Sequence, residues 1–192
     1  MKRIVLLVLA AFLCLGGLDS RTEAAFEYKP VAFILLDYSG NASKDDFLSW
    51  REQARQAYYV PYYEIIKTYE PTEKALKIIA ESGTRTSKLE KATLQKIAAE
   101  VPAKVVVLLC VNQMDERLVH SRGFYWHDEG DLLQQVIASA DMYVYKAEND
   151  RMLKNKLRHF EIEDIPISTS ATEIIKYELR KLVNKMENRE QI

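Results

Sequence analysis

The fold is decided by KVVVLLCVN at residues 104–112, the longest unbroken apolar run after the N-terminal segment. A run of this length without polar alternation is typical of a strand buried on both faces, and it is too short to be a membrane helix. VAFILL at Val31–Leu36 has the same character. We therefore expect these two runs to form the centre of one sheet.

The segments around these two runs indicate an α/β (α+β) domain. Four helices are expected from apolar stripes and capping residues, at about 43–58, 72–82, 87–100 and 170–186. Ser43, Thr72, Ser87 and Ser170 supply the caps. Further strands are expected at 62–68, 132–146 and 152–163. In the 72–82 helix the inward residues should be Ala75, Leu76 and Ile79. The pattern predicts one mixed sheet of about five strands with an antiparallel C-terminal meander, covered by about four helices.

The N-terminus has the features of a signal peptide. Lys2 and Arg3 precede an apolar stretch, Ile4–Leu15, and Thr22-Glu23-Ala24 offers a small-x-small cleavage site. We expect residues 1–24 to be this leader and residues 25–192 to be a single domain. Retention of the leader as an uncleaved anchor is the alternative. Cys14 is preceded by Phe12 and Leu13 instead of the small residues of a lipoprotein signal, so no lipid attachment is predicted.

Composition excludes some classes of partner. Of the 192 residues 48% are hydrophobic, enough for a proper core, and the formal net charge is only -1. A chain with so little net charge lacks the excess of positive charge that is typical of proteins that bind nucleic acid or an anionic membrane surface. Beyond the leader, no segment is apolar enough to predict a membrane span.

Removal of the leader would leave one cysteine, Cys110, in the middle of the central run. A catalytic thiol needs an accessible, electropositive setting, whereas the neighbours here are valines and leucines. The sequence therefore predicts a structural, unreactive thiol and no internal disulfide.

No motif predicts a catalytic, metal or cofactor site. Glycine-rich phosphate loops and the G-x-S-x-G elbow are missing, and so is the close histidine spacing of most zinc sites. An alternative interpretation is a secreted hydrolase or metal-dependent enzyme that uses carboxylates and histidines between residues 115 and 129. Its candidate groups are Asp115, Glu116, His120, His127 and Asp128. A serine hydrolase would need Ser39 or Ser43, beside Asp37, to meet one of these histidines.

The richest polar-aromatic cluster lies in the glycine-bracketed segment 122–131. We predict that this segment is the partner-facing tip of a hairpin, because exposed aromatics beside charged residues favour protein binding. The candidate binding residues are Phe124, Tyr125, Trp126, His127, Asp128 and Glu129. The competing interpretation is that the aromatic rings pack back onto the sheet.

The order of elements, together with the leader, resembles a family of exported bacterial envelope domains that includes the N-terminal domain of TolB and the periplasmic domain of the curli secretion channel. The likeness lies in four stretches: VAFILLDYSGN, LQKIAAEVPAKVVVLLCVNQMDE, MYVYKAENDRMLKNKLRHFE and the final amphipathic helix. The resemblance implies a non-enzymatic envelope protein that binds a partner protein or assembles with itself. The chain departs from many relatives in having no lipobox. It also has no hairpin apolar enough for a membrane-spanning barrel wall, so no pore is inferred.

Overall fold

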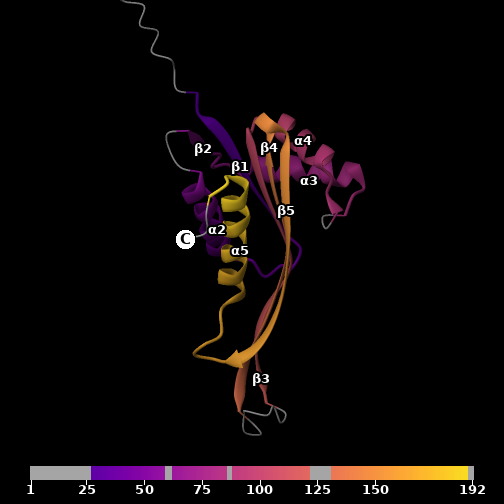
Figure 1. Ribbon diagram of the computed structural model, residues 1–192. Coiled ribbons are helices and arrows are strands. Elements are labelled where there is room, and N and C mark those ends of the chain that lie inside the picture. The colour runs from indigo at the N-terminus through magenta and orange to yellow at the C-terminus, as the bar shows by residue number, and fades with distance from the viewer. Residues whose placement is uncertain (1–26, 59–61, 86–87, 122–130, 190–192) are drawn as a thin grey trace, which may run out of the picture.

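The computed structural model describes residues 27–58, 62–85, 88–121 and 131–189, which form one sheet with helices on both faces (Figure 1). The elements in chain order are β1 (Lys29–Asp37), α2 (Lys44–Ala57), β2 (Tyr63–Ile65), α3 (Glu70–Ser82), α4 (Lys91–Glu100), β3 (Val105–His120), β4 (Leu132–Lys146), β5 (Arg151–Asp164) and α5 (Ala171–Met186). Residues 1–24 lie outside the described residues, so the signal peptide stays a prediction. Among the described residues, no helix has the length and apolar character needed to cross a bilayer.

The sheet is mixed, as predicted. Its strand order is β2-β1-β3-β4-β5, with β1 parallel to both neighbours and β3, β4 and β5 forming an antiparallel meander. The two apolar runs lie side by side at its centre, from Val31 opposite Val105 to Asp37 opposite Val111. Every residue from Val105 to Val111 is buried. A strand covered on both faces can be apolar throughout, which is why this run lacks polar alternation.

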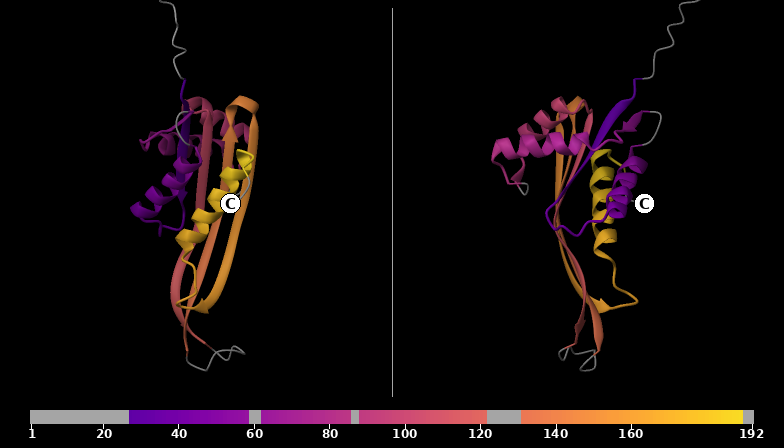
Figure 2. Two further views of the ribbon diagram at one scale, coloured as in Figure 1. Left: turned by 60° about the vertical axis from the view of Figure 1, so that its left-hand side comes forward. Right: turned by 180° about the vertical axis from the view of Figure 1, so that it is seen from behind.

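Helices cover both faces of the sheet and form two apolar cores (Figure 2). On one face, α2 and α5 pack on alternate residues of β3, including Val107 and Leu109. On the other face, α3 and α4 pack on the intervening residues, including Leu108 and Cys110. Side chains of consecutive strand residues point to opposite faces, so a single apolar run serves both cores.

Helix stripes were predicted well and helix starts less well. The apolar stripe of α2 that its helical spacing predicts, Phe47, Trp50, Ala54 and Ala57, is buried, and Ser43 and Ser170 cap α2 and α5. Helix α3 begins at Glu70, before the expected cap Thr72, because Pro71 suits the first helical turn, where its missing N–H is not needed. Leu76 is exposed, contrary to expectation.

Two further boundaries differ from the predicted ones. The strand expected at 62–68 shrinks to the three residues Tyr63–Ile65. Ser87, the expected cap of α4, lies outside the described residues, and α4 begins at Lys91.

Strand β3 continues well beyond the apolar run. Its register against β4 shifts between Val111 and Gln113, so Asn112 is an extra residue, and pairing then resumes as far as His120. Beyond Glu116, whose side chain contacts the first residue of α5, residues 117–120, 132–135 and 162–164 of β3, β4 and β5 project past the helices, and we call them the arm (Figures 1 and 2). The remainder of the described structure is the body.

Candidate functional site

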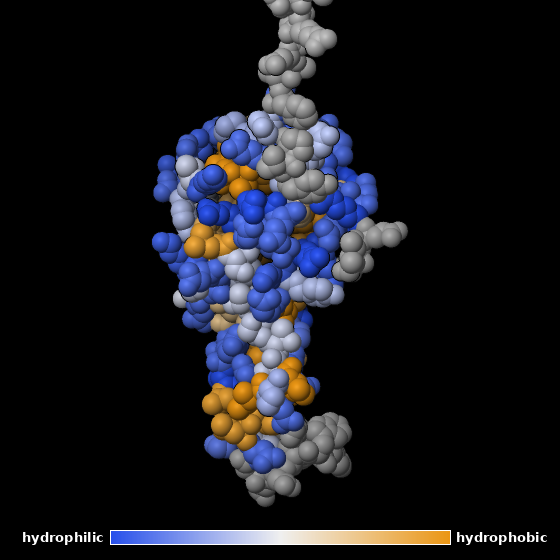
Figure 3. Space-filling view, turned by 90° about the vertical axis from the view of Figure 1, so that its left-hand side faces the viewer, coloured by the Kyte–Doolittle hydropathy of each residue, from blue (hydrophilic) through white to orange (hydrophobic). Residues whose placement is uncertain are grey.

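Four large apolar side chains are exposed at the far end of the arm. They are Leu118 (57% exposed), Leu132 (45%), Ile165 (45%) and Ile167 (66%). Figure 3 shows apolar surface gathered there, on the side of the molecule that α2 and α5 cover further up. We call these four residues the distal patch. Clustered apolar surface of this kind is a feature of binding sites, whereas single exposed apolar residues are ordinary.

A hydrogen bond holds the two parts of the distal patch on one face. Ile165 and Ile167 lie in the connection between β5 and α5, and Ser168 in that connection donates to Gln134 Oε1 at 2.7 Å. Gln134 pairs with Leu118 across the β3–β4 ladder, and paired residues share a face. The connection therefore lies on the face that carries Leu118.

The arm is tied to the body at its base. Glu116 Oε1 accepts a hydrogen bond from the backbone N–H of Ala171, the first residue of α5, at 2.7 Å. Asn41 Nδ2 donates to the carbonyl oxygen of Met114 at 2.6 Å. A carboxylate at a helix N-terminus is favourable because it satisfies a free N–H and complements the helix dipole. These contacts fix the direction in which the arm projects.

The predicted binding residues Phe124, Tyr125, Trp126, His127, Asp128 and Glu129 lie outside the described residues. The described chain does show the hairpin that they were expected to join, since β3 and β4 pair antiparallel as far as His120 opposite Leu132. The N–H of Ser121 donates to the carbonyl of Asp131 at 2.8 Å and closes this end. The hairpin is therefore confirmed, and the binding role of its connection stays a prediction.

The described carboxylates of the enzyme interpretation are not brought together. Asp115 and Glu116 are consecutive in β3 and point to opposite faces of the sheet, and Glu116 is engaged with α5. Within the described ranges, no group of three or more His, Cys, Asp or Glu side chains could hold a metal ion. His127 and Asp128 lie outside those ranges.

The candidate serines have structural partners. The carboxylate of Asp37 accepts hydrogen bonds from Ser39 Oγ at 2.6 Å and from the N–H of Ala42 at 3.1 Å, which shapes the turn after β1. Ser43 caps α2. His120 lies far from these two serines: Asn41, which lies between them in sequence, is bonded to Met114, and β3 from Met114 to His120 spans about 20 Å at about 3.3 Å per residue. Neither Ser39 nor Ser43 therefore pairs with His120.

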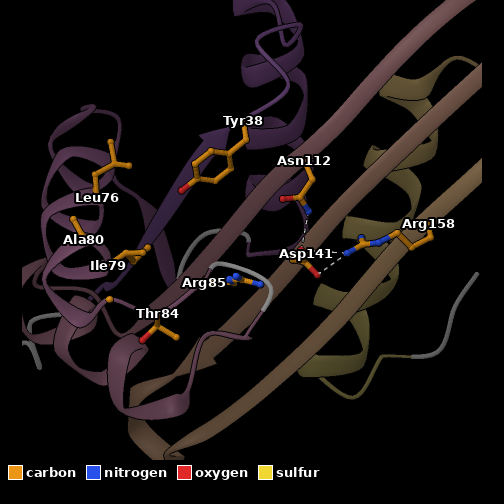
Figure 4. Close-up of a pocket in the computed structure, with 10 residues that line it drawn as sticks. Tyr38, Leu76, Ile79, Ala80, Thr84, Arg85, Asn112, Asp141 and Arg158 are labelled. Carbon is orange, nitrogen blue, oxygen red and sulfur yellow. Dashed lines mark hydrogen bonds and ion pairs between the residues drawn. The ribbon is translucent and has the colours of Figure 1, made fainter.

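A second candidate site is a cavity of about 570 Å³ beside the α3–α4 face of the sheet (Figure 4). It is lined by Tyr38, Leu76, Ile79, Ala80, Gly83, Thr84, Arg85, Asn112, Asp141 and Arg158. Asp141 is fully buried, and Figure 4 shows Asn112 and Arg158 pointing toward it. Asn112 Nδ2 donates to its carboxylate at 2.7 Å, and Arg158 approaches it at 3.4 Å.

The chemistry of this cavity indicates a structural role for Asp141. Both of its charge-stabilising partners come from neighbouring strands, as a buried carboxylate requires. Burial raises the pKa of the adjacent Cys110 thiol, and the charge of Asp141 raises it further, so no thiolate nucleophile is available. Sequence reasoning missed Asp141, although an acidic residue within the apolar stretch ASADMYVY was a signal that could have identified it.

Comparisons with known proteins give no family. No protein-family model matches the chain, and no curated protein is similar to it in sequence. Several solved bacterial structures are similar to it at low identity. The hypothetical protein CT253 from Chlamydia trachomatis is 11% identical with a TM-score of 0.45, over 84% of this chain and 97% of that one.

Two further structures are similar at comparable identity and lower TM-score. The PelC dodecamer from Paraburkholderia phytofirmans is 10% identical with a TM-score of 0.41, over 84% of this chain and 90% of that one. Lipoprotein GNA1162 from Neisseria meningitidis is 12% identical with a TM-score of 0.36, over 83% and 99%. These likenesses are too slight to carry a functional argument, and the resemblance to TolB and the curli channel stays a prediction.

Proposed function

We propose that this chain is an exported, non-enzymatic protein of the bacterial cell envelope that works by binding a partner protein, or further copies of itself, through the end of its arm. The observation that carries the proposal is the distal patch. Its four large apolar side chains are exposed at the end of the arm, where no helix of the described structure covers the sheet. Exposed apolar surface costs solubility, and proteins keep it where a partner covers it. The leader-like N-terminus supports export.

The predicted tip completes this surface. Ser121 and Asp131 lie at the end of the arm, and the segment between them supplies Tyr125 and Trp126. An aromatic side chain buried in a partner's pocket contributes about 2 kcal/mol or more to binding, while charged neighbours mainly set orientation and association rate. We therefore include Phe124–Glu129 with the distal patch in one binding surface.

A photo-crosslinking amino acid at Leu132 tests the proposal in the exporting cell. We expect one adduct of defined mass from Leu132, and none from the matched position Leu76, which is also 45% exposed but lies on α3 of the body. Leu118→Ser and Ile167→Ser should abolish the adduct. No adduct at Leu132, or equal adducts from Leu76, would show that the end of the arm is not the binding surface.

The tip is tested by replacing Tyr125 and Trp126 with alanine. Surface substitutions change folding stability by less than about 0.5 kcal/mol, so we expect the adduct from Leu132 to disappear while the melting temperature stays almost unchanged. If the double variant melts several degrees earlier and still forms the adduct, the two rings belong to the core.

Export is tested separately by N-terminal sequencing of the protein recovered from the envelope fraction. We expect a start near residue 25, after the Thr22-Glu23-Ala24 site. A chain that begins at Met1 and stays in the cytoplasm would remove the envelope part of the proposal.

A further inference from the structure

The two edges of the sheet are unequal. One outer strand, β2, has three residues, and the other, β5, has 14. About half of the backbone N–H and C=O groups of an edge strand point outward, ready to pair with another strand. Within the described residues, nothing pairs with the outer side of β5, which runs from the body into the arm (Figure 1).

The charges along β5 change sign part-way. The basic residues come first, at Arg151, Lys154, Lys156 and Arg158. The acidic residues follow, at Glu161, Glu163 and Asp164. Charged side chains, especially lysines, are one means by which an edge strand avoids pairing with an unmatched strand. A strand that is basic at one end and acidic at the other repels a parallel copy of itself and attracts an antiparallel one.

We propose that β5 pairs antiparallel with β5 of a second copy, about a two-fold axis close to His159, so that two five-stranded sheets become one. In this register Lys154 lies opposite Asp164 of the partner subunit. Arg158 lies opposite Phe160 of the partner subunit, whose ring is 63% exposed in a single copy and can receive a guanidinium on its face. A two-fold axis makes each of these contacts twice.

The helices leave room for this pairing. Helix α5 packs over β4 and β5, so α5 and its copy would be separated by three strand spacings, about 14 Å in all. Packed helices need only about 8–10 Å between their axes. On the other face, α3 and α4 lie over β1, β3 and β4. Each arm would lie beside the body of the partner.

The inference rests on the proposed function for the class of protein, an exported binding protein, but it uses a surface separate from the distal patch. A failure of β5 pairing therefore leaves the crosslink at Leu132 unaffected, and a failure of that crosslink leaves β5 pairing unaffected. The two proposals can be overturned one at a time.

A charge swap tests the pairing in the protein as the cell exports it. Sedimentation should show a dimer whose dissociation constant rises with salt concentration. Lys154→Glu/Lys156→Glu makes β5 largely acidic, and Glu161→Lys/Glu163→Lys makes it largely basic. We expect each variant alone to raise the dissociation constant at least about tenfold, because two strands whose net charge has the same sign repel each other, and an equimolar mixture of the acidic and basic variants to form dimers again. The control Lys77→Glu/Lys88→Glu makes the same charge change on exposed residues near α3 and α4 and should leave the dimer unchanged.

A cysteine at the axis gives a second measurement that does not depend on charge. His159→Cys should form a disulfide-linked dimer under mild oxidation, since each copy meets itself at that position, whereas Lys154→Cys should not. The proposal is overturned if the wild-type protein stays monomeric at the highest concentration it tolerates. It is also overturned if the charge variants dimerise like the wild type, if their mixture does not associate, or if both cysteine variants crosslink equally.

Discussion

One strand passes through two environments in this molecule. From Val105 to Val111, β3 lies between two helical layers and every residue is buried, whereas most of its residues from Asn112 to His120 are exposed. The backbone pairing to β4 hardly changes along the way, apart from the extra residue at Asn112. The difference lies in the helices, which cover the body and not the arm. Strand pairing alone therefore shapes the arm, and apolar burial stabilises the body.

The comparison implies a division of work. Burial of apolar surface contributes roughly 25 cal/mol per Å², so the two cores of the body supply most of the folding free energy. Residues of the arm contribute little to that sum and are free to meet a partner. Functional surfaces are commonly drawn from such weakly stabilised regions.

The largest expected effect compares the same substitution at two places on β3. Leu109→Ala removes a fully buried side chain from the body and should lower the free energy of unfolding by about 2–5 kcal/mol. Leu118→Ala removes an exposed side chain from the arm and should change it by less than about 0.5 kcal/mol. Urea denaturation measures both. Equal losses would mean that the arm contributes as much as the body to stability.

A smaller effect is expected at Cys110, which is buried in the body. Burial raises the pKa of its thiol, so a thiol reagent should label the native protein only as fast as the protein unfolds. Leu118→Cys places a thiol on the arm and should be labelled at once. Cys110→Ser should cost about 1–3 kcal/mol, because it buries a hydroxyl in an apolar site. Rapid labelling of native wild-type protein would contradict the buried assignment.

The sequence predicted the body better than the arm, for a physical reason. A strand between two helical layers buries side chains on both faces, so its sequence is an unbroken apolar run. Val31–Leu36 and Lys104–Asn112 are recognisable in the sequence as such runs. The outer half of β3 has few buried positions, which leaves only a weak apolar pattern around Met114 and Leu118. The hairpin with its tip at 122–131 was predicted, but this pattern did not mark residues 113–120 as a strand.

The candidate sites show the same limit. Asp141 stands alone in its strand, and its partners Asn112 and Arg158 come from the two neighbouring strands, so no local spacing reveals the ion pair. The distal patch likewise joins residues from β3, β4 and the β5–α5 connection. Leu118 is exposed because the covering helices end before they reach it. The sequence around Leu118 does not predict how far those helices extend.

The smallest expected effect lies at the junction between body and arm. Asp46 in the first turn of α2 accepts hydrogen bonds from the backbone N–H of Ser43 at 2.8 Å, from Ser43 Oγ at 2.7 Å and from Thr172 Oγ1 of α5 at 2.8 Å, close to Met114 at the base of the arm. Partial burial opposes the charge of Asp46, but these hydrogen bonds outweigh it and lower the pKa of its carboxyl.

This lowered pKa predicts a specific dependence of stability on pH. A carboxyl whose folded-state pKa lies below its unfolded value stabilises the fold above the unfolded pKa, near 3.8, and that contribution is lost as the pH falls through the folded value. Asp46→Asn should therefore cost about 1 kcal/mol at pH 6, as the loss of a capping carboxylate typically does, and progressively less below pH 4. Urea denaturation of both proteins between pH 6 and pH 3 measures the difference, with Asp45→Asn as the control, since Asp45 is an exposed neighbour in the same helical turn. A difference that stays constant across this range would show that the charge of Asp46 does not stabilise the junction, and that the direction of the arm is set by Glu116 and Asn41 alone.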